Sequence, residues 1–385
     1  MPRSALARVR RLVVKVGTGT LTDPAGRFDR ANCARLAAEL AAVIAGARGR
    51  ALVLVSSGAI TAGAQRLGLE RIKGKPWDIA TRQACAAVGQ PLLMAAWDQA
   101  FAAHGLVTAQ VLLTADDLAS RKRFLNARRT FQKLLERGVV PVVNENDTVA
   151  VDEIKVGDND SLAALVATCV GADLVALLTD VEGLYDRDPR HPAARLVADV
   201  HKVTSEVERM AGGAGSESSV GGMVTKVAAA KRLAAQGVGT ALLSGRRAGA
   251  LEALLAGDPV GTYFRPGAER RAGRREWLTL AARGKGTILV DAGARKALAD
   301  QGKSLLPSGV KAVEGSFGVG DPVDIAVAGE PPFARGLAGY GADEVRRIAG
   351  LKSGEIERVL GYKYLDEVVH RNDMVLTDPG REATR

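Results

Sequence analysis

The chain has little of what metal centres and disulfide frameworks are made from. It contains only three cysteines and four histidines, and neither set shows the spacing of a metal site. Cys33, Cys85 and Cys169 lie far apart along the sequence. We therefore expect reduced, mostly buried thiols, as is typical of cytoplasmic proteins, and no metal held by protein side chains alone.

Long apolar runs are absent as well. No run reaches the roughly 18 residues that a membrane-spanning helix needs, and Asp173 interrupts the best candidate. The apolar stretch at 12–16 contains Lys15 and is too short for a signal peptide. We expect a cytoplasmic protein without a membrane partner. Hydrophobic residues still make up 47% of the 385 positions, which is enough for the cores of two domains.

Two common nucleotide-binding motifs are missing. A dinucleotide fingerprint would need a third glycine after Gly17 and Gly19, but Thr22 stands at that position. A phosphate-binding Walker loop ending in Lys303 would begin with a glycine where the chain has Ala297. Any nucleotide site must therefore be built in another way.

Short apolar segments alternate with longer amphipathic or alanine-rich segments through the first two-thirds of the chain. Strands with near-continuous Val and Leu are typical of a parallel sheet covered by helices on both faces, so we predict a three-layer, parallel-sheet α/β fold. The predicted strands are Arg11–Gly17, Ala51–Ser57, Leu106–Leu113, Val139–Val143, Leu174–Thr179 and Thr240–Ser244. The predicted helices are Asp29–Ala45, Trp77–Ala103, Arg123–Arg137, Asp160–Val170, Met223–Gln236 and Ala248–Leu255.

The pattern changes after Gly261. Closely spaced glycines and short apolar runs such as Thr287–Val290 and Pro322–Val327 indicate a small β-rich domain. The predicted divisions are a first domain at 1–262, a linker at 263–276, a second domain at 277–372 and a tail at 373–385. The net charge of +10 invites a nucleic-acid interpretation, but neither domain is a basic arm. Anionic substrates also favour a basic field around their cleft.

Two polar clusters stand in the middle of the chain. Asn144 to Asp147 follow an apolar strand, and Gly157 to Asp160 open an alanine-rich helix. Helix capping explains part of the second cluster, because Asp and Asn are favoured N-caps. Capping needs only one such residue, however, and ligands of parallel sheets bind where the strands end at their carboxyl side. We therefore predict a ligand site here.

Two lysines occupy positions where a positive charge needs an anion. Lys15 interrupts an apolar strand before a Gly/Thr loop that can approach phosphate, unless it is an edge lysine that reaches solvent. Lys226 follows the Gly/Ser loop 212–222 in the first turn of a helix, where it opposes the helix dipole. The alternative for that loop is a flexible surface segment. Two lysines and polar strand ends suit phosphoryl transfer, and a carboxylate acceptor would need no general base.

A series of motifs along the first domain resembles the amino-acid kinase family. These are VVKVGTGTLT (13–22), SSGAI (56–60), AAVGQ (86–90), RFLNAR (123–128), VNENDTV (143–149), IKVGDNDSLAAL (154–165), LLTDVEGLYDRDPR (177–190) and GGMVTK (221–226). The region at about 275–372 resembles the PUA domain through Leu305–Val310 and Gly320–Val323. The resemblance therefore implies an amino-acid kinase fold followed by a small β-rich PUA-like barrel.

The resemblance also implies roles for individual residues. Lys15 and Lys226 correspond to the lysines that neutralise phosphate charge, and Asp160 to the residue that organises them. Ser57, Asp147 and Asn159 match the positions that bind the amino-acid substrate. The positions that match the family's ATP-binding residues are Lys15, Thr179, Asp180, Val220, Gly221, Gly222, Met223, Val224, Thr225 and Lys226.

The implied activity is ATP-dependent phosphorylation of the side-chain carboxylate of L-glutamate to glutamyl 5-phosphate, the first step of proline biosynthesis. Mg²⁺ would arrive with ATP, proline would act as feedback inhibitor, and the chain would form a homo-oligomer, either a dimer or a tetramer. One alternative is a kinase of another small carboxylate such as acetylglutamate, aspartate or carbamate. The other is an RNA-binding protein acting through the PUA-like domain, but the mild basic charge favours a regulatory or structural role there over RNA binding.

Overall fold

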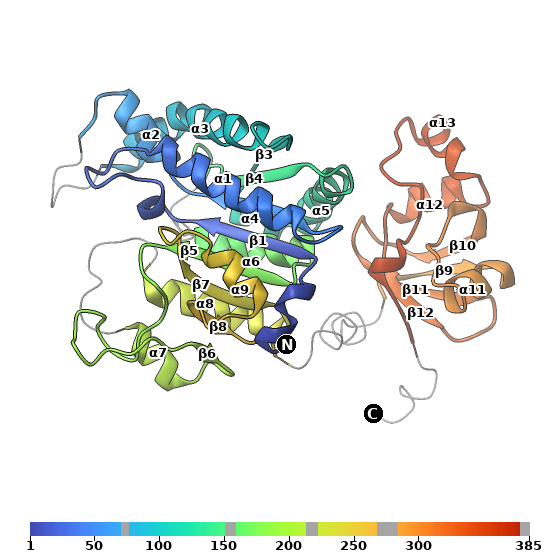
Figure 1. Cartoon of the computed structure of the whole chain (residues 1–385). Coiled ribbons are helices and arrows are strands. Elements are labelled where there is room, and N and C mark those ends of the chain that lie inside the picture. Colours follow the sequence, from blue (N-terminus) through green and yellow to red (C-terminus); the bar gives the residue numbers. More distant parts are fainter. Residues whose placement is uncertain (71–76, 151–158, 213–221, 268–283, 378–385) are drawn as a thin grey trace. The chain divides into compact units, whose positions relative to one another are not determined.

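The computed structural model describes residues 1–70, 77–150, 159–212, 222–267 and 284–377 (Figure 1). The chain divides into two compact units, Met1–Arg270 and Arg271–Arg385. The predicted linker at 263–276 and the predicted tail at 373–385 fall largely outside the described residues.

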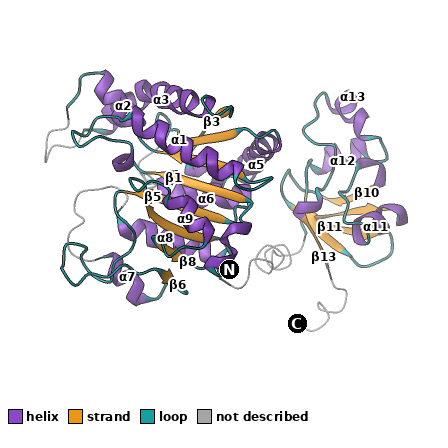
Figure 2. Ribbon diagram, viewed as in Figure 1, coloured by secondary structure: helices purple, strands orange, loops and turns teal. Residues whose placement is uncertain are grey.

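The first unit is built on an eight-stranded sheet with the order β3-β4-β2-β1-β5-β7-β8-β6 (Figure 2). The six strands from β3 to β7 in this order are parallel, whereas β8 runs antiparallel to β7 and pairs in parallel with β6. The strands are β1 Arg11–Val16, β2 Ala51–Ser56, β3 Thr108–Leu113, β4 Val140–Glu145, β5 Leu174–Thr179, β6 Asp199–Val200, β7 Gly239–Ser244 and β8 Thr262–Phe264.

Helices cover both faces of this sheet. One core contains α1, α3 and α9, and the other contains α5, α6 and α8. The helices are α1 Arg30–Ala45, α2 Ala59–Arg66, α3 Ile79–Ala102, α4 Ala115–Ala119, α5 Arg121–Glu136, α6 Asn159–Val170, α7 Ser205–Ala211, α8 Met223–Ala235 and α9 Ala250–Ala256, with 3-10 turns η1 Arg3–Arg8 and η2 Thr18–Thr20.

The alternation of side chains along β1 decides where its lysine points. Leu12, Val14 and Val16 pack into the core with α1 and α3, and Val13 packs into the core with α6 and α8. Successive side chains of a strand point to opposite faces. Lys15 therefore lies on the same face as Val13, toward α6 and α8.

Helices α2 and α3 meet at a pair of glycines. A Cβ atom added at Gly63 would lie 1.8 Å from the carbonyl oxygen of Cys85, and one added at Gly89 would lie 1.8 Å from the carbonyl oxygen of Ala59. No side chain fits at either position, so the two backbones pack directly on each other. This contact brings the start of α2, next to Ser57, close to the middle of α3.

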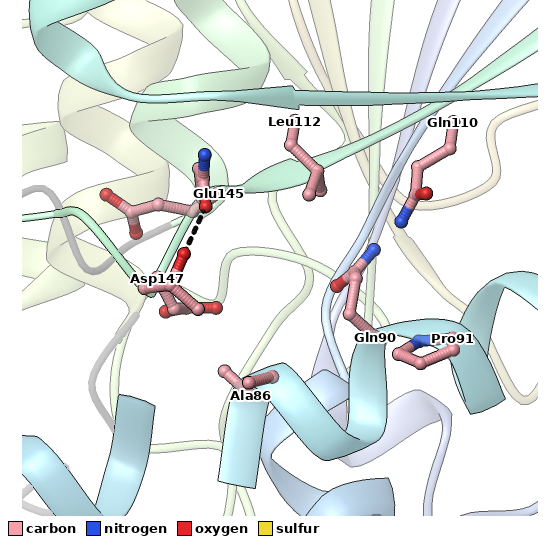
Figure 3. A pocket seen from close by; sticks show the side chains of 10 residues that line it. Ala86, Gln90, Pro91, Gln110, Leu112, Glu145 and Asp147 are labelled. Atoms are coloured by element: carbon pink, nitrogen blue, oxygen red, sulfur yellow. Dashed lines mark hydrogen bonds between the residues drawn. The ribbon is translucent and has the colours of Figure 1, made fainter. Parts of the chain in front are cut away.

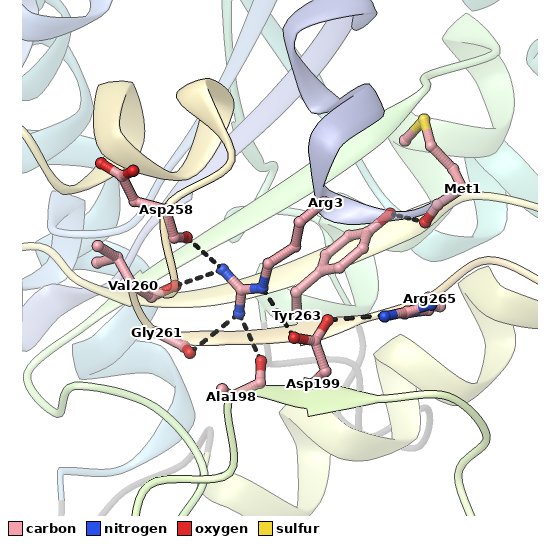
Figure 4. Close-up of polar contacts among 9 residues, drawn as sticks. All are labelled: Met1, Arg3, Ala198, Asp199, Asp258, Val260, Gly261, Tyr263 and Arg265. Carbon is pink, nitrogen blue, oxygen red and sulfur yellow. Dashed lines mark hydrogen bonds and ion pairs between the residues drawn. The ribbon is translucent and has the colours of Figure 1, made fainter.

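The N-terminal turn η1 is anchored to the β6–β8 edge by a buried arginine (Figure 4). The Arg3 Nε atom donates to Asp199 Oδ2 at 3.1 Å. Its two terminal nitrogens donate to backbone carbonyls of Asp258 (2.7 Å), Val260 (3.1 Å), Gly261 (3.3 Å) and Ala198. All five N–H donors of the guanidinium are thereby used. No sequence pattern predicts this anchor, because its acceptors are mostly backbone atoms distant in sequence.

The predicted α/β organisation of the first unit is confirmed. All six predicted strands and all six predicted helices are present, with ends that differ by a few residues. The short elements β6, β8, α2, α4 and α7 were not predicted. The two strands are two and three residues long, too short for a periodic pattern, and α2 carries glycine and alanine in place of a polar face.

The second unit holds a five-stranded sheet with the order β10-β9-β11-β12-β13 and a hydrophobic core of its own. The expected apolar runs form β9 and β11, which pair in parallel. The elements are β9 Gly286–Val290, α11 Ala292–Ala299, β10 Val310–Gly315, β11 Pro322–Val327, β12 Ala334–Leu337, α12 Ala342–Ile348, α13 Ile356–Leu360 and β13 Met374–Leu376. Within the described part of the chain, no helix is long and apolar enough to cross a membrane.

Candidate active site

Lys15 lies on a central strand of the sheet, and its ammonium group is buried. β1 pairs with β2 on one side and β5 on the other, so the alternative of an edge lysine reaching solvent is wrong. Only 5% of Lys15 is exposed. Its Nζ atom lies 2.6 Å from Asp160 Oδ1, at the start of α6.

Lys226 approaches the same carboxylate from the first turn of α8. Its Nζ atom lies 3.1 Å from Asp160 Oδ2. The hydroxyl oxygen of Thr225 lies 3.2 Å from the same carboxylate oxygen, and its shorter hydrogen bond, of 2.7 Å, goes to the carbonyl of Gly222. Lys226 is 7% exposed. A lysine that opposes the helix dipole is thus retained next to a buried carboxylate, which compensates for its unfavourable position.

The electrostatics of this cluster keep Asp160 ionised. Complete burial would raise the pKa of Asp160, but the ammonium groups of Lys15 and Lys226 outweigh that effect and hold its pKa below the ordinary value. Two cations then share one anion. The positive charge of these two lysines, held in a buried setting at the carboxyl end of the sheet, suits an anionic ligand such as phosphate.

The loop after β1 and the end of β5 lie beside the cluster. Gly17 donates its backbone N–H to the carbonyl of Leu178 at 3.3 Å, and a Cβ atom at Gly17 would lie 3.5 Å from Lys15 Nζ. Asp180 approaches the same loop, since a Cβ atom at Gly19 would lie 3.5 Å from Asp180 Oδ2. Asp180 Oδ1 accepts a hydrogen bond of 2.9 Å from the hydroxyl of Thr179. The predicted ATP-binding residues Thr179 and Asp180 are therefore adjacent to the glycine loop.

A chain of hydrogen-bonded amide side chains begins at Asn159, the first residue of α6. Asn159 Nδ2 donates to Ser57 Oγ at 2.7 Å and to Asn144 Oδ1 at 3.2 Å. Asn144 Nδ2 in turn donates to Gln90 Oε1 at 2.8 Å. The structure thus brings two predicted substrate-binding residues, Ser57 and Asn159, into contact. Asn159 also precedes Asp160 directly, so the amide chain adjoins the lysine cluster.

A pocket of about 330 Å³ opens between α3, β3 and the segment after β4 (Figure 3). The predicted substrate residue Asp147 lies on its wall, and Gln90 belongs both to this wall and to the amide chain. Burial raises the pKa of Asp147, and the charge of Arg82 opposes that shift only in part. The pocket is lined by Ala86, Ala87, Gln90, Pro91, Gln110, Leu112, Glu145, Asn146, Asp147 and Thr148.

Several predicted site residues lie outside the residues that the structure describes. Val220, Gly221 and most of the 212–222 loop lie outside the described residues, as do Gly157 and Asp158 of the second polar cluster. Gly222 is the N-cap of α8, and Met223, Val224 and Thr225 form its first turn with Lys226. Among the described residues, no group of three His, Cys, Asp or Glu side chains could hold a metal ion.

Two residues of the site were not predicted as functional. Asn144 was assigned only to a polar cluster, and Gln90 only to a motif. Their part in the amide chain depends on β4 and α3 lying side by side, which local sequence does not reveal. The one indication in the sequence was that a glutamine stands in the small-residue stretch 86–91 of a largely apolar helix, where a polar side chain needs a partner.

Comparison with known proteins assigns the class. The family model for the amino acid kinase family matches residues 10–243, and the model for the PUA domain matches residues 286–360. The chain belongs to the amino acid kinase family. Within that family its similarity is to glutamate 5-kinases, beginning with that of Anaeromyxobacter dehalogenans (strain 2CP-C), which is 75% identical over 99% of this chain and 100% of the relative.

Two further relatives carry the same name. The glutamate 5-kinase of Myxococcus xanthus (strain DK1622) is 53% identical, with 97% of this chain and 98% of the relative covered. That of Syntrophotalea carbinolica (strain DSM 2380 / NBRC 103641 / GraBd1) is 49% identical, with 98% of this chain and 100% of the relative covered. The similarity therefore extends through both units and is not confined to the kinase domain.

Proposed function

We propose that this protein transfers the γ-phosphoryl group of ATP to the side-chain carboxylate of L-glutamate, giving glutamyl 5-phosphate and ADP. The observation that carries the proposal is the pair of buried lysines that share Asp160. The high identity to glutamate 5-kinases over the full chain specifies the acceptor. The reaction is the first step of proline biosynthesis.

The chemistry needs positioning and charge, and the cluster can supply both. An oxygen of the glutamate side-chain carboxylate attacks the γ-phosphorus, a new P–O bond forms, and the bond from the γ-phosphorus to the ADP oxygen breaks. Lys15 and Lys226 donate to the phosphate oxygens as charge moves toward ADP. Asp160 holds both ammonium groups in place and takes no proton, because the acceptor carboxylate is already ionised at neutral pH.

The remaining site residues divide between the two substrates. Ser57, Asp147 and Asn159 bind glutamate, and their support is the amide chain and the adjoining pocket. The proposed ATP-binding residues gather at the ends of β1 and β5 and at the start of α8, together with two positions before it. They are Lys15, Thr179, Asp180, Val220, Gly221, Gly222, Met223, Val224, Thr225 and Lys226.

A kinase of this class uses ATP with a divalent metal, and we propose that the metal is Mg²⁺ carried on the ATP phosphates. The donor set fits this arrangement, because Lys15 pairs with one oxygen of Asp160 and Lys226 with the other. Phosphates and water can complete the coordination that Mg²⁺ prefers. The ion would withdraw charge from the phosphates, while the lysines remain the protein's own contribution.

Acceptor profiling tests the assignment. The protein is incubated with ATP, Mg²⁺ and hydroxylamine, which converts an acyl phosphate into a hydroxamate, and each candidate acceptor is supplied in turn. We expect hydroxamate with L-glutamate and at most traces with acetylglutamate, aspartate or carbamate. A preference for another acceptor would instead establish the alternative function, a kinase of that carboxylate.

Further properties are proposed from the family resemblance. Proline acts as feedback inhibitor, the protein is a cytoplasmic homo-oligomer, and residues 1–262 and 277–372 are the catalytic and PUA-like domains, joined by 263–276 and followed by a tail at 373–385. The PUA-like domain has a regulatory or structural role.

Two of these properties can be tested directly. Repeating the acceptor assay with proline tests feedback inhibition, and titrating structured RNA at several salt concentrations tests the role of the PUA-like domain. Salt-sensitive submicromolar RNA binding without glutamate-dependent ATP turnover would favour the RNA-binding alternative.

A further inference from the structure

The amide chain beside the active site has a direction. Each amide side chain carries one carbonyl oxygen that accepts and one NH₂ group that donates. Asn159 donates to Asn144, and Asn144 donates to Gln90. In this amide chain, each NH₂ group donates to the carbonyl oxygen of the next side chain, from Asn159 through Asn144 to Gln90. The last acceptor is Gln90 Oε1.

This direction fixes which atom of Asn159 is left for a ligand. Its NH₂ group is used by Ser57 Oγ and Asn144 Oδ1, at 2.7 and 3.2 Å. Its carbonyl oxygen is buried and has no hydrogen-bond partner among the residues that the structure describes. A buried acceptor without a partner costs about 1–3 kcal/mol, so this atom is suited to receive an N–H group from a bound molecule.

The acceptor substrate has one group that can satisfy that oxygen. Both carboxylates of glutamate are ionised at neutral pH and only accept hydrogen bonds, whereas its α-ammonium group only donates. Ser57 complements this arrangement, since its oxygen accepts from Asn159 and its own O–H can donate to a carboxylate oxygen. The two side chains together offer an acceptor for an ammonium group and a donor for a carboxylate.

We propose that Gln90 is a positioning residue for amine recognition: by accepting from Asn144 it sets the direction of the amide chain and so presents Asn159 Oδ1 to the α-ammonium group of the substrate. This inference rests on the proposed function and deepens it. Gln90 acts through Asn144 and Asn159. Its place on α3, next to the direct backbone contact at Gly89, holds the end of the chain on a rigid element.

The protein offers a matched control on the same helix. Gln83 also lies on α3, and its NH₂ group donates to the carbonyl of Ala150 at 3.2 Å, outside the amide chain. Gln90→Met removes the terminal acceptor with little change in side-chain volume, after which Asn144 and Asn159 are free to turn over. Gln83→Met removes a hydrogen bond from the same helix and leaves the amide chain intact. Gln90→Glu keeps an acceptor oxygen at the end of the amide chain.

The test compares L-glutamate with glutarate, which has both carboxylates and no amino group. We measure kcat and KM for each acceptor in the wild type and the three variants, with thermal unfolding of the same samples. In Gln90→Met we expect the ratio of kcat/KM for glutamate to that for glutarate to fall about tenfold or more. This decrease should come from a higher KM for glutamate, and KM for ATP should be unchanged. Gln83→Met should stay within about twofold of the wild type, and Gln90→Glu should retain the preference for glutamate.

The outcomes separate this inference from the proposed function. An active wild type with an unchanged ratio in Gln90→Met would overturn the role of Gln90 and leave the kinase assignment standing. The role of Gln90 would also be overturned if Gln90→Glu lost the preference together with Gln90→Met. A wild type without glutamate-dependent ATP turnover would overturn the proposed function, and this inference with it.

Discussion

Two buried cationic clusters in the first unit differ in how their charge is balanced. Arg3 uses all five of its N–H groups on Asp199 and four backbone carbonyls (Figure 4). Lys15 carries three N–H groups, and among the described residues Asp160 is its one ionic partner. Asp160 also forms an ion pair with Lys226. Every N–H group of Arg3 has an acceptor within the fold, whereas Lys15 and Lys226 pair with the same carboxylate at the proposed phosphate site.

The difference separates anchoring from ligand binding. A saturated cation fixes the segments that supply its acceptors, here the N-terminal turn and the β6–β8 edge. Burying two lysines beside one carboxylate carries a desolvation cost, and such buried charged groups are typical of ligand-binding and catalytic sites. Loss of the first should therefore affect folding, and loss of the second should affect turnover.

Lys226→Ala gives the largest expected effect. Turnover of ATP with glutamate should fall about 1,000-fold, equivalent to about 4 kcal/mol, because a donor to the transferred phosphoryl group is lost. The unfolding midpoint should change little, since Lys15 still neutralises Asp160. Lys231→Ala is the control: Lys231 lies on the same helix, is exposed and pairs with Glu208. Near-normal turnover in Lys226→Ala would contradict the claim that the lysine cluster acts in turnover and the Arg3 cluster in folding.

Arg3→Met should show the opposite pattern. The free energy of unfolding should fall by about 3 kcal/mol, because Asp199 and the carbonyl groups lose a buried partner. At temperatures where the variant is folded, kcat should match the wild type. Chemical denaturation and steady-state kinetics measure the two quantities. Arg8→Met, in the same turn but exposed, should change neither, and a stable Arg3→Met variant would show that the anchor is dispensable.

The pH dependence of stability should reveal the ionised Asp160. Its pKa is lowered below the ordinary value of 3.8, so its stabilising contribution is present above pH 3.8 and is lost only as pH falls through the lower folded-state pKa. Asp160→Asn should cost about 2 kcal/mol at pH 7, because two buried lysines lose their carboxylate. Urea denaturation from pH 7 to pH 3 should show a constant difference down to about pH 4. A difference that vanishes near pH 6 would contradict the lowered pKa.

Asp147→Asn should give the smallest change in stability, with the opposite sign. Burial raises the pKa of Asp147 above 3.8, so the ionised carboxylate weakens the fold at neutral pH. The substitution should stabilise the protein by about 0.5 kcal/mol at pH 7, and the gain should disappear below pH 3.8. KM for glutamate should rise in the same variant. A loss of stability at pH 7 would show that the ionised form has a structural partner.

The sequence predicted the parts of the molecule that repeat a pattern or carry a costly charge. Apolar runs located the parallel strands, and Lys15 and Lys226 stood out because lysine is unfavourable in an apolar strand and in the first turn of a helix. The ion pairs to Asp160 then followed from the resemblance. In the structure, Lys15 lies two residues after Val13 on β1, so its side chain points to the same face of the sheet, toward α6 and α8.

What local sequence could not give were contacts set by tertiary packing. Most acceptors of Arg3 are backbone carbonyls that lie 195 to 258 residues away in the sequence. No pattern of side chains in the sequence can therefore predict them. The place of Gln90 depends on α2 and α3 touching at Gly63 and Gly89. Glycine in a helix usually weakens it, and only the packed structure shows why these two are needed.

Isotope transfer tests the central claim most directly. L-Glutamate labelled with ¹⁸O in its side-chain carboxylate is incubated with ATP, Mg²⁺ and the protein. The acyl phosphate is then allowed to cyclise, as its amino group attacks the carbonyl carbon and releases phosphate. Because the carboxylate oxygen forms the new bond to phosphorus, the released phosphate should carry one ¹⁸O atom, visible as an isotope shift in ³¹P NMR. Formation of ADP with unlabelled phosphate would mean that water is the acceptor, and would contradict the account.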